Sequence, residues 1–390
     1  MNSIKYVVAL LVVMCIISIP PALAATSSTT TAATAVNGGI AIAESNAAAI
    51  DEGQASADAT AVAVDGGVAV AESDSLAEES GIAGSTTYAT AMDGAQATAI
   101  AESIAEGTKA QANTESDAIA SGDGANANAE SVGKAHGKNT RADASAEADA
   151  ECSDDCAANA GSFSVAGDTG AKAETHSDAR STGQNSDADA RSTGLALAKN
   201  SNAIANSEAD ANAGGRADAR SDAKAYGESS KAESATGATA DGKHTLATSN
   251  ARTGAGLDST AIASIYTNAE ATSSAGAVSR GTISAYANQN GAETHVSADL
   301  GAGTGSSKAS AVADVHGSSY TEAGGEPAAG VIIEDATVAA TGHDSLATTD
   351  IEADATAGEH VDGETEISVH SFAKGMAQAL SSVFAWANNL

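Results

Sequence analysis

Residues 38–45 read Gly-Gly-Ile-Ala-Ile-Ala-Glu-Ser, and residues 66–73 read Gly-Gly-Val-Ala-Val-Ala-Glu-Ser. The second half of this motif, Ala-x-Ala-Glu-Ser, occurs at Ala41–Ser45, Ala69–Ser73, Ala99–Ser103 and Ala127–Ser131. A half-period is visible too, because Ala55 begins another alternating run midway between Ala41 and Ala69. A degenerate copy, Ala-Asp-Ala-Arg-Ser, begins at Ala188 and recurs one period later at Ala217. Self-similarity at such a fixed period is typical of stacked repeats.

Within each repeat, Ala alternates with other residues at a period of two, as in residues 55–63 and 142–150. In a strand, this alternation places every Ala on one face. In a helix, it scatters Ala around the axis, although Ala has the highest helix propensity of all residues. The pattern and the dense Gly, Ser, Thr and Asn favour strands. Disorder and helix remain the alternatives.

The composition excludes several classes of protein. Of the 390 residues, 97 are Ala and 39 are Gly, and residues 25–390 hold only 43 Val, Ile, Leu and Phe, fewer than an ordinary core needs. We therefore expect no enzyme, since an active-site pocket is usually walled by large apolar side chains. The formal net charge of −33 argues against nucleic-acid binding, which depends on positive charge.

Residues 1–24 have the form of a secretory signal peptide, so we expect a secreted, extracellular protein with no membrane span after its removal. Lys5 precedes an apolar run, and Ala22-Leu23-Ala24 supplies small residues for cleavage before Ala25. An uncleaved anchor is the alternative, although the run is shorter than the roughly 20 residues that a span needs. In an oxidising compartment, Cys152 and Cys156 predict one small-loop disulfide, with free thiols or a metal site as alternatives.

Changes of composition divide the chain further. Residues 25–37 are rich in Thr, Ser and Ala and indicate a linker. Regular acidic repeats follow over residues 38–132. Residues 133–245 form degenerate polar repeats with few large apolar residues, which predicts possible disorder, and residues 246–366 carry further repeats.

Residues 367–390 differ from the repeats and predict an amphipathic C-terminal helix. On a 3.6-residue wheel, one arc gathers large apolar side chains. The contact face of this helix is Phe372, Met376, Leu380, Val383 and Trp386. Three roles are open: the helix covers the end of the repeat stack, mediates oligomerisation or binds a membrane surface.

Short Ala-faced strands at this spacing predict an all-β fold, an Ala-rich β-solenoid. Methyl groups reach little space, so the cross-section must be thin. A single coil buries too little apolar surface to offset its conformational entropy, so stacking of coils and self-association are favoured. Acidic outer faces oppose lateral sheet packing.

The Gly-x-Ala-x-Ala-Glu-Ser pattern, with its half-period midway between copies, resembles the head repeats of trimeric autotransporter adhesins, which are parallel β-rolls. The chain departs from that family in lacking a coiled-coil stalk. Its Ala, Gly and Ser content is also similar to that of silk-like structural proteins, although Asp and Glu are more abundant here. These resemblances imply a repeat fold and no particular site residues.

No motif for catalysis or cofactor binding stands out. Residues 301–308 imitate a phosphate loop but lack its Gly-Lys-Ser/Thr ending. The eight His are scattered singly, and no metal-ligand spacing is present. Diffuse carboxylates, densest over residues 359–366, would bind Ca²⁺ only weakly.

Three functions follow as hypotheses. The first is a secreted, self-assembling structural protein of a silk, matrix or coat. The second is a surface-binding solenoid, either an adhesin or an ice-binding protein. The third is an acidic matrix protein associated with cations or mineral.

Overall fold

The structure is a computed structural model. It describes residues 26–389 except 37–38, 50–53, 65–66, 79–81, 94–95, 123, 155, 185, 198, 213–215, 227–230, 243–244, 256–259, 272–275, 288–292, 305–309, 322–327, 342–345, 358–361 and 375–377. It describes the exposure of side chains no farther along the chain than Tyr266. The expected signal peptide, residues 1–24, lies outside the described residues.

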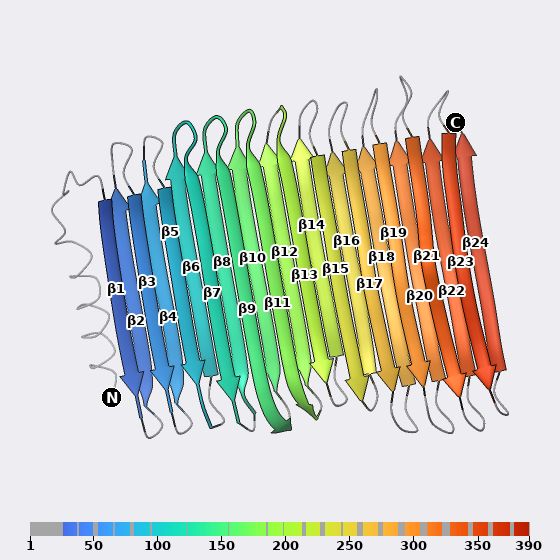
Figure 1. The fold of residues 1–390 in the computed structure, drawn as a ribbon, viewed down its shortest axis with the longest axis horizontal. Coiled ribbons are helices and arrows are strands. Elements are labelled where there is room, and N and C mark those ends of the chain that lie inside the picture. The colour runs from blue at the N-terminus through green and yellow to red at the C-terminus, as the bar shows by residue number, and fades with distance from the viewer. Residues whose placement is uncertain are drawn as a thin grey trace, which may run out of the picture.

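The described chain is a parallel β-solenoid built from two 12-stranded sheets. Sheet A contains the odd strands: β1 (Thr26–Ala35), β3 (Gln54–Ala63), β5 (Ile82–Ala91), β7 (Gln111–Ser121), β9 (Arg141–Asp154), β11 (Lys172–Gln184), β13 (Asn202–Asn212), β15 (Lys231–Gly242), β17 (Thr260–Ala271), β19 (Glu293–Thr304), β21 (Ala328–Thr341) and β23 (Asp362–Lys374). Sheet B contains the even strands: β2 (Ile40–Ala49), β4 (Val68–Ala77), β6 (Gln96–Glu106), β8 (Asn126–His136), β10 (Ala157–Gly167), β12 (Asp187–Leu197), β14 (Arg216–Tyr226), β16 (Thr245–Ala255), β18 (Gly276–Ala287), β20 (Ser310–Thr321), β22 (Leu346–Ala357) and β24 (Gln378–Asn389). Each turn of the solenoid adds one strand to each sheet, and the stack runs from β1 at one end to β24 at the other (Figure 1). The expectation of an all-β repeat solenoid is confirmed.

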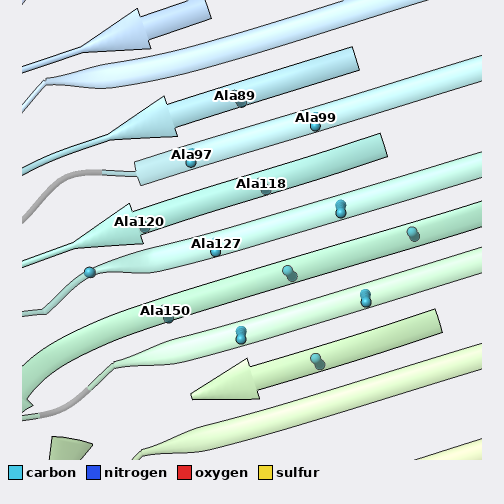
Figure 2. Close-up of a cluster of buried hydrophobic side chains, with 14 of the residues drawn as sticks. Ala89, Ala97, Ala99, Ala118, Ala120, Ala127 and Ala150 are labelled. Atoms are coloured by element: carbon cyan, nitrogen blue, oxygen red, sulfur yellow. The ribbon is translucent and has the colours of Figure 1, made fainter. Parts of the chain in front are cut away.

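The alternation of Ala produces the core. In β3, residues of odd number are buried and residues of even number are more exposed. A similar alternation recurs in other strands of both sheets as far as side-chain exposure is described. Register stacks the inward residues into ladders. One ladder of sheet B consists of residues at most 2 % exposed: Ala41, Ala69, Ala97, Ala127, Ala158, Ala188, Ala217 and Ala247. The two sheets therefore meet through methyl groups (Figure 2).

A line of buried hydroxyls runs through the middle of this methyl core. Ser116 donates to the carbonyl oxygen of Glu130 at 2.6 Å, and Ser131 donates to Ser116 at 3.0 Å. The pattern continues where Ser177 donates to the carbonyl oxygen of Arg191 at 2.6 Å. The thin core brings these three hydroxyls within reach of the opposite sheet, so their hydrogen bonds are formed without water.

The turns between the sheets also stack on one another. In the turn of residues 107–110, Lys109 has a φ of 65° and its backbone N–H donates to the carbonyl oxygen of Lys138 at 2.8 Å. Gly137 has a φ of 126°, and a Cβ there would lie 2.2 Å from the carbonyl oxygen of Gly107. Glycine is therefore required at residue 137 both by backbone conformation and by the stacking of adjacent turns.

The register refines the repeat seen in the sequence. Ala188 pairs with Ala217, as the recurring Ala-Asp-Ala-Arg-Ser predicts. In contrast, Ala69 pairs with Ala97, so the Ala-x-Ala-Glu-Ser copy that begins at Ala99 lies two positions out of step. A shift of two preserves the inward side of every Ala, so the core tolerates it.

Two expectations about the ends of the chain are wrong. Residues 26–35 form strand β1 instead of a linker, because their period-two pattern pairs with β3 over the whole length of the strand. The segment expected as a C-terminal helix carries the end of β23 and strand β24. There Ala379 and Ala385 fall in register with Ala347 and Ala353, so parallel pairing with β22 outweighs the helical apolar arc.

The zone 133–245, for which the composition predicts possible disorder, carries strands β9–β15. Its core needs no large apolar residues because small residues, Ala together with Ser and Thr, fill the space between the sheets. Ala146 and Ala209, for example, are both 0 % exposed. A low content of Val, Ile, Leu and Phe is therefore compatible with this thin fold.

Candidate functional site

The first strand of sheet A leaves its core-facing side incompletely covered. Thr29, Ala33 and the other inward residues of β1 are half-buried, whereas their register partners on β3, such as Ala57 and Ala61, are 0 % exposed. β1 and β2 are the first strands of their sheets, and β23 and β24 are the last. Within the described part of the chain, one long edge of each of these four strands therefore carries unpaired backbone groups.

The outer face of sheet A carries a ladder of carboxylates. Asp117, Glu147, Asp178 and Glu208 occupy adjacent strands in register, at the usual strand separation of about 4.8 Å. Burial, followed by repulsion from Glu115, Glu147 and Asp149, raises the pKa of Asp117 to about 6.

Asp178 lies within this ladder and is only 6 % exposed. Burial raises its pKa to about 6, with Arg180 opposing the rise and Glu208 and Glu147 adding to it. Arg180 Nη2 lies 2.6 Å from Asp178 Oδ2, while Asp178 Oδ1 has no hydrogen-bond partner. The ladder thus holds more negative charge than its neighbours compensate.

The outer face of sheet B changes character along the stack. On β2, β4 and β6 it carries carboxylates and the exposed aliphatic residues Ile40, Ile42 and Leu76. Over β12 and β14, like charges stack across strands, and opposite charges pair along each strand. Arg191 Nη2 lies 2.5 Å from Asp189 Oδ2, and Arg220 Nη2 lies 2.7 Å from Asp218 Oδ2. Both pairs compensate charge locally, and Asp218 is buried beneath its arginine partner, with 3 % of its surface exposed.

Outward glycines open shallow grooves on both faces. On sheet B, Gly161 lies in register between Glu130 and Arg191, in a groove of about 410 Å³. On sheet A, Gly237 lies between Glu208 and Tyr266, in a groove of about 400 Å³. A third groove, of about 320 Å³, lies at Gly84. These grooves could not be predicted from the sequence, because only the register between strands shows which side chains flank each glycine.

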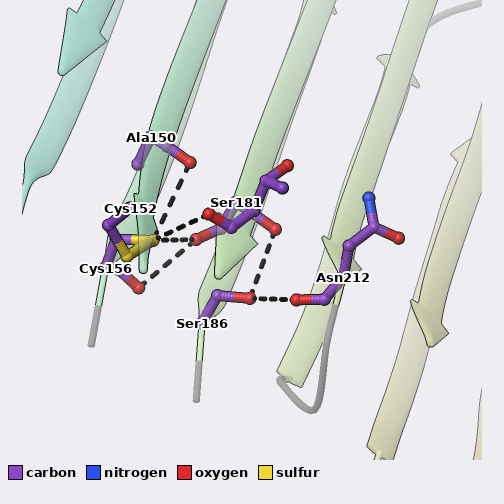
Figure 3. The surroundings of a disulfide bond; sticks show 7 residues. Ala150, Cys152, Cys156, Ser181, Ser186 and Asn212 are labelled. Atoms are coloured by element: carbon purple, nitrogen blue, oxygen red, sulfur yellow. Dashed lines mark hydrogen bonds between the residues drawn. A yellow bond between two sulfur atoms is a disulfide. The ribbon is translucent and has the colours of Figure 1, made fainter. Parts of the chain in front are cut away.

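The two cysteines of the sequence prediction form a disulfide that joins the end of β9, at Cys152, to Cys156 just before β10, with their Cα atoms 5.9 Å apart (Figure 3). Cys156 is 3 % exposed and occupies the same position in its turn as Ala125 and Ser186 occupy in the neighbouring turns. The Ser181 hydroxyl donates to the carbonyl oxygen of Cys156 at 3.3 Å. The disulfide therefore links residues whose positions are already set by hydrogen bonds to the neighbouring coils.

The residues of the predicted helix face do not form one face in the structure. Phe372 lies in β23, Met376 lies outside the described residues, and the other three lie in β24. The role predicted for this face, covering the end of the stack, has no support from these strands.

The remaining sequence signals lie partly outside the described residues. The phosphate-loop imitation lies in β19 and in residues outside the described range, and the acidic patch of residues 359–366 is described only from residue 362 onward. Among the described residues, no three His, Cys, Asp or Glu side chains are arranged to hold a metal ion. Within the same residues, no helix is long and apolar enough to cross a membrane.

The ice-binding alternative expects regular ranks of Thr on one flat face. The outward ladders mix residue types instead. Thr34 is followed by Val62 and Thr90, and Thr60 by Tyr88 and Asp117. Neither of these two outward ladders is therefore built from Thr alone.

Comparison of the chain with protein-family models, with curated proteins and with solved structures found no match. The parallel two-sheet solenoid is compatible with the β-roll architecture that the sequence resemblance implies. It does not single out a family.

Proposed function

We propose that the chain is a secreted structural protein that assembles end to end, the first coil of one copy stacking on the last coil of another. The observation that carries this proposal is the half-buried inner side of β1, whose partners one coil farther along are fully buried. A coil from a second copy would bury that side and pair the free edge in the same way as β3 does. Residues 1–24, with the form of a signal peptide, support secretion.

The free edge of β1 has a defined set of donors. Val64 donates its backbone N–H to the carbonyl oxygen of Ala35 at 3.0 Å, so the peptide groups of Ala35 face β3. Along a parallel strand, the backbone groups of alternate residues face opposite neighbours. Ala35, Ala33 and Thr31 therefore bond to β3, while the N–H groups of Thr30 and Ala32 face the free edge.

The acidic outer faces favour growth along the stack over growth sideways. The ladder from Asp117 to Glu208 on sheet A repels a second acidic face that approaches it. At the first coil, the incoming end meets β1, which carries no charged residue. Filaments one solenoid wide are thus the expected product.

The experiment compares the chain from Ala25 to Leu390 with the variant Thr30→Pro/Ala32→Pro. Proline removes two free-edge donors and no donor to β3, so the variant should fold. Electron microscopy and light scattering should show filaments for the parent chain and monomers for the variant. Circular dichroism should give the same β spectrum for both.

A control variant, Thr31→Pro, removes a donor to β3 and should lower the unfolding temperature, unlike the edge variant. A parent chain that stays monomeric at its solubility limit overturns the proposal. So does an edge variant that forms filaments at the rate of the parent.

A surface-binding role is the second candidate function. The grooves at Gly161 and Gly237 favour it, since each combines hydrogen-bonding side chains with an aromatic ring in its lining. This role is compatible with assembly, because the grooves lie on the outer faces and the assembling edges lie at the ends.

A further inference from the structure

Neither backbone conformation nor crowding requires glycine at residues 161 and 237. No positive φ occurs at either residue, and a Cβ at Gly161 would meet nothing within 4 Å. At Gly237, the nearest atom to such a Cβ is Glu208 Cγ at 3.9 Å. In contrast, a Cβ at the inward Gly133 would lie 2.8 Å from the carbonyl oxygen of Asp143. Glycine weakens a strand interior and often marks a place where a ligand approaches closely.

The groove at Gly161 offers polar groups on one side and a ring on the other. Asn159 Nδ2 donates to Asn128 Oδ1 at 2.9 Å, which leaves the Asn159 oxygen and the Asn128 amide group for a ligand. Phe163 lies two residues after Gly161 in β10. It lines the same groove and is half-buried. An amide pair and a flat apolar surface therefore border one open space.

The charges around this groove largely cancel. Arg191 binds Asp189 through both Nε and Nη2, at 3.0 and 2.5 Å, so this guanidinium is already compensated. Glu130 remains as an exposed acceptor. The groove consequently suits a neutral ligand rich in hydroxyl groups better than an anion.

The groove at Gly237 repeats this arrangement on the opposite face. Tyr266, which is 48 % exposed, stands in register on one side of the glycine, and Glu208 stands on the other. Asn206 and His176 complete the polar lining. The groove at Gly84 lacks an aromatic residue other than a histidine, which separates it from these two.

We propose that the grooves at Gly161 and Gly237 each bind one pyranose ring of a neutral oligosaccharide. The aromatic rings of Phe163 and Tyr266 pack against the C–H face of the sugar, whose burial on an apolar surface is favourable. Amide and carboxylate oxygens accept hydrogen bonds from its hydroxyl groups. The net charge of −33 repels acidic polysaccharides, so the ligand class is the neutral one. Sites on both faces would let a filament cross-link a glycan-bearing surface or matrix, with avidity supplied by repetition.

The test is an amide chemical-shift titration with cellohexaose, chitohexaose and mannohexaose. It uses the chain from Ala25 to Leu390 with the edge substitutions Thr30→Pro/Ala32→Pro, which keep the chain monomeric. We expect at least one of the three to shift the signals of β10 and β15, with a Kd of about 0.1–1 mM, as befits shallow sites. Hexagalacturonic acid, an acidic counterpart, should shift neither set. Failure of all three neutral sugars to shift these signals overturns the proposal.

Groove-filling variants locate the binding. Gly161→Val should remove the shifts of β10 and leave those of β15, and Gly237→Val should do the reverse. The same substitution at Gly84 is the matched control and should change neither. Phe163→Leu, which keeps apolar volume without a flat ring, should weaken binding at β10 about tenfold, corresponding to about 1.4 kcal/mol.

Binding that survives both valine substitutions also overturns the proposal. These outcomes are independent of end-to-end assembly, because the titrated chain carries the edge substitutions and neither groove is lined by a residue of β1 or β2.

Discussion

Alanine owes its place in this protein to its size. At Ala61, which is 0 % exposed, the side chain lies in a ladder between Ala33 and Ala89 and faces the opposite sheet across a layer of methyl groups. Neither a smaller nor a larger residue serves as well, because the spacing of the sheets leaves room for a methyl group and occasionally for a hydroxyl.

Replacing Ala61 by Leu should therefore destabilise the fold by overpacking, by about 1–3 kcal/mol or more. Urea unfolding followed by circular dichroism measures the change in midpoint. Thr60→Leu, at the neighbouring outward position, is the matched control and should change stability by about 0.5 kcal/mol at most. Equal effects at the two positions would contradict an alanine-limited core.

At the scale of single elements, the connection between β9 and β10 carries a disulfide, Cys152–Cys156. It nevertheless stacks on its neighbours through the same backbone hydrogen bonds as the other turns. Ala157 donates to the carbonyl oxygen of Ala125, and Asp187 donates to that of Cys156, at 3.1 and 2.9 Å. The same ladder of turns thus continues through the disulfide.

Removal of the disulfide should cost only about 2 kcal/mol, since the closed loop is short. The variant Cys152→Ala/Cys156→Ala should keep its β spectrum, because the Ala125 turn shows that alanine fits there. Its urea midpoint should match that of the parent chain after reduction with dithiothreitol. A complete loss of structure on reduction would mean that the bond is required for the stacking of coils.

At the scale of the whole molecule, negative charge accumulates across strands that are distant in the sequence. Asp117 and Asp178 lie on β7 and β11 and belong to one carboxylate ladder, and each has a pKa of about 6 against an ordinary 3.8. A carboxyl group with a raised pKa in the folded state keeps a proton that the unfolded chain releases. The free energy of unfolding should therefore increase as the pH falls from about 6 to about 4.

For the two groups together, the free energy of unfolding should be about 2 kcal/mol higher at pH 4 than at pH 7, after the nominal value is halved for solvent screening. Differential scanning fluorimetry between pH 4 and pH 7.5 measures it. Asp117→Asn should raise the unfolding temperature at pH 7.5 and flatten the pH profile. The control Asp58→Asn, on β3 with Thr30 and Thr86 as register partners, should leave the profile unchanged.

The sequence was sufficient for the solenoid because alternation at period two needs no long-range information. The repeat copies at Ala41 and Ala69, and at Ala188 and Ala217, also predicted the register correctly. The prediction of a C-terminal helix was wrong for a local reason. Phe372–Trp386 satisfies a helical wheel and a strand alternation alike, and only pairing with β22 decides between them. The carboxylate ladder and the grooves could not be predicted, since each requires the exact register of three or more coils.

The two-position shift between the motif copies at Ala69 and Ala99 has a consequence for how the gene can vary in length. Ala97, the register partner of Ala69, lies two residues before the motif copy that begins at Ala99, and both Ala97 and Ala99 remain buried. Coils also differ in length along sheet A, since Thr26 pairs with Gln54 across a shorter coil than the one that separates Ala328 from Asp362. Insertions of six nucleotides within a strand should therefore be nearly neutral, whereas insertions of three or nine reverse its faces and survive only in turns. Natural length variants of this gene should show that six-nucleotide step.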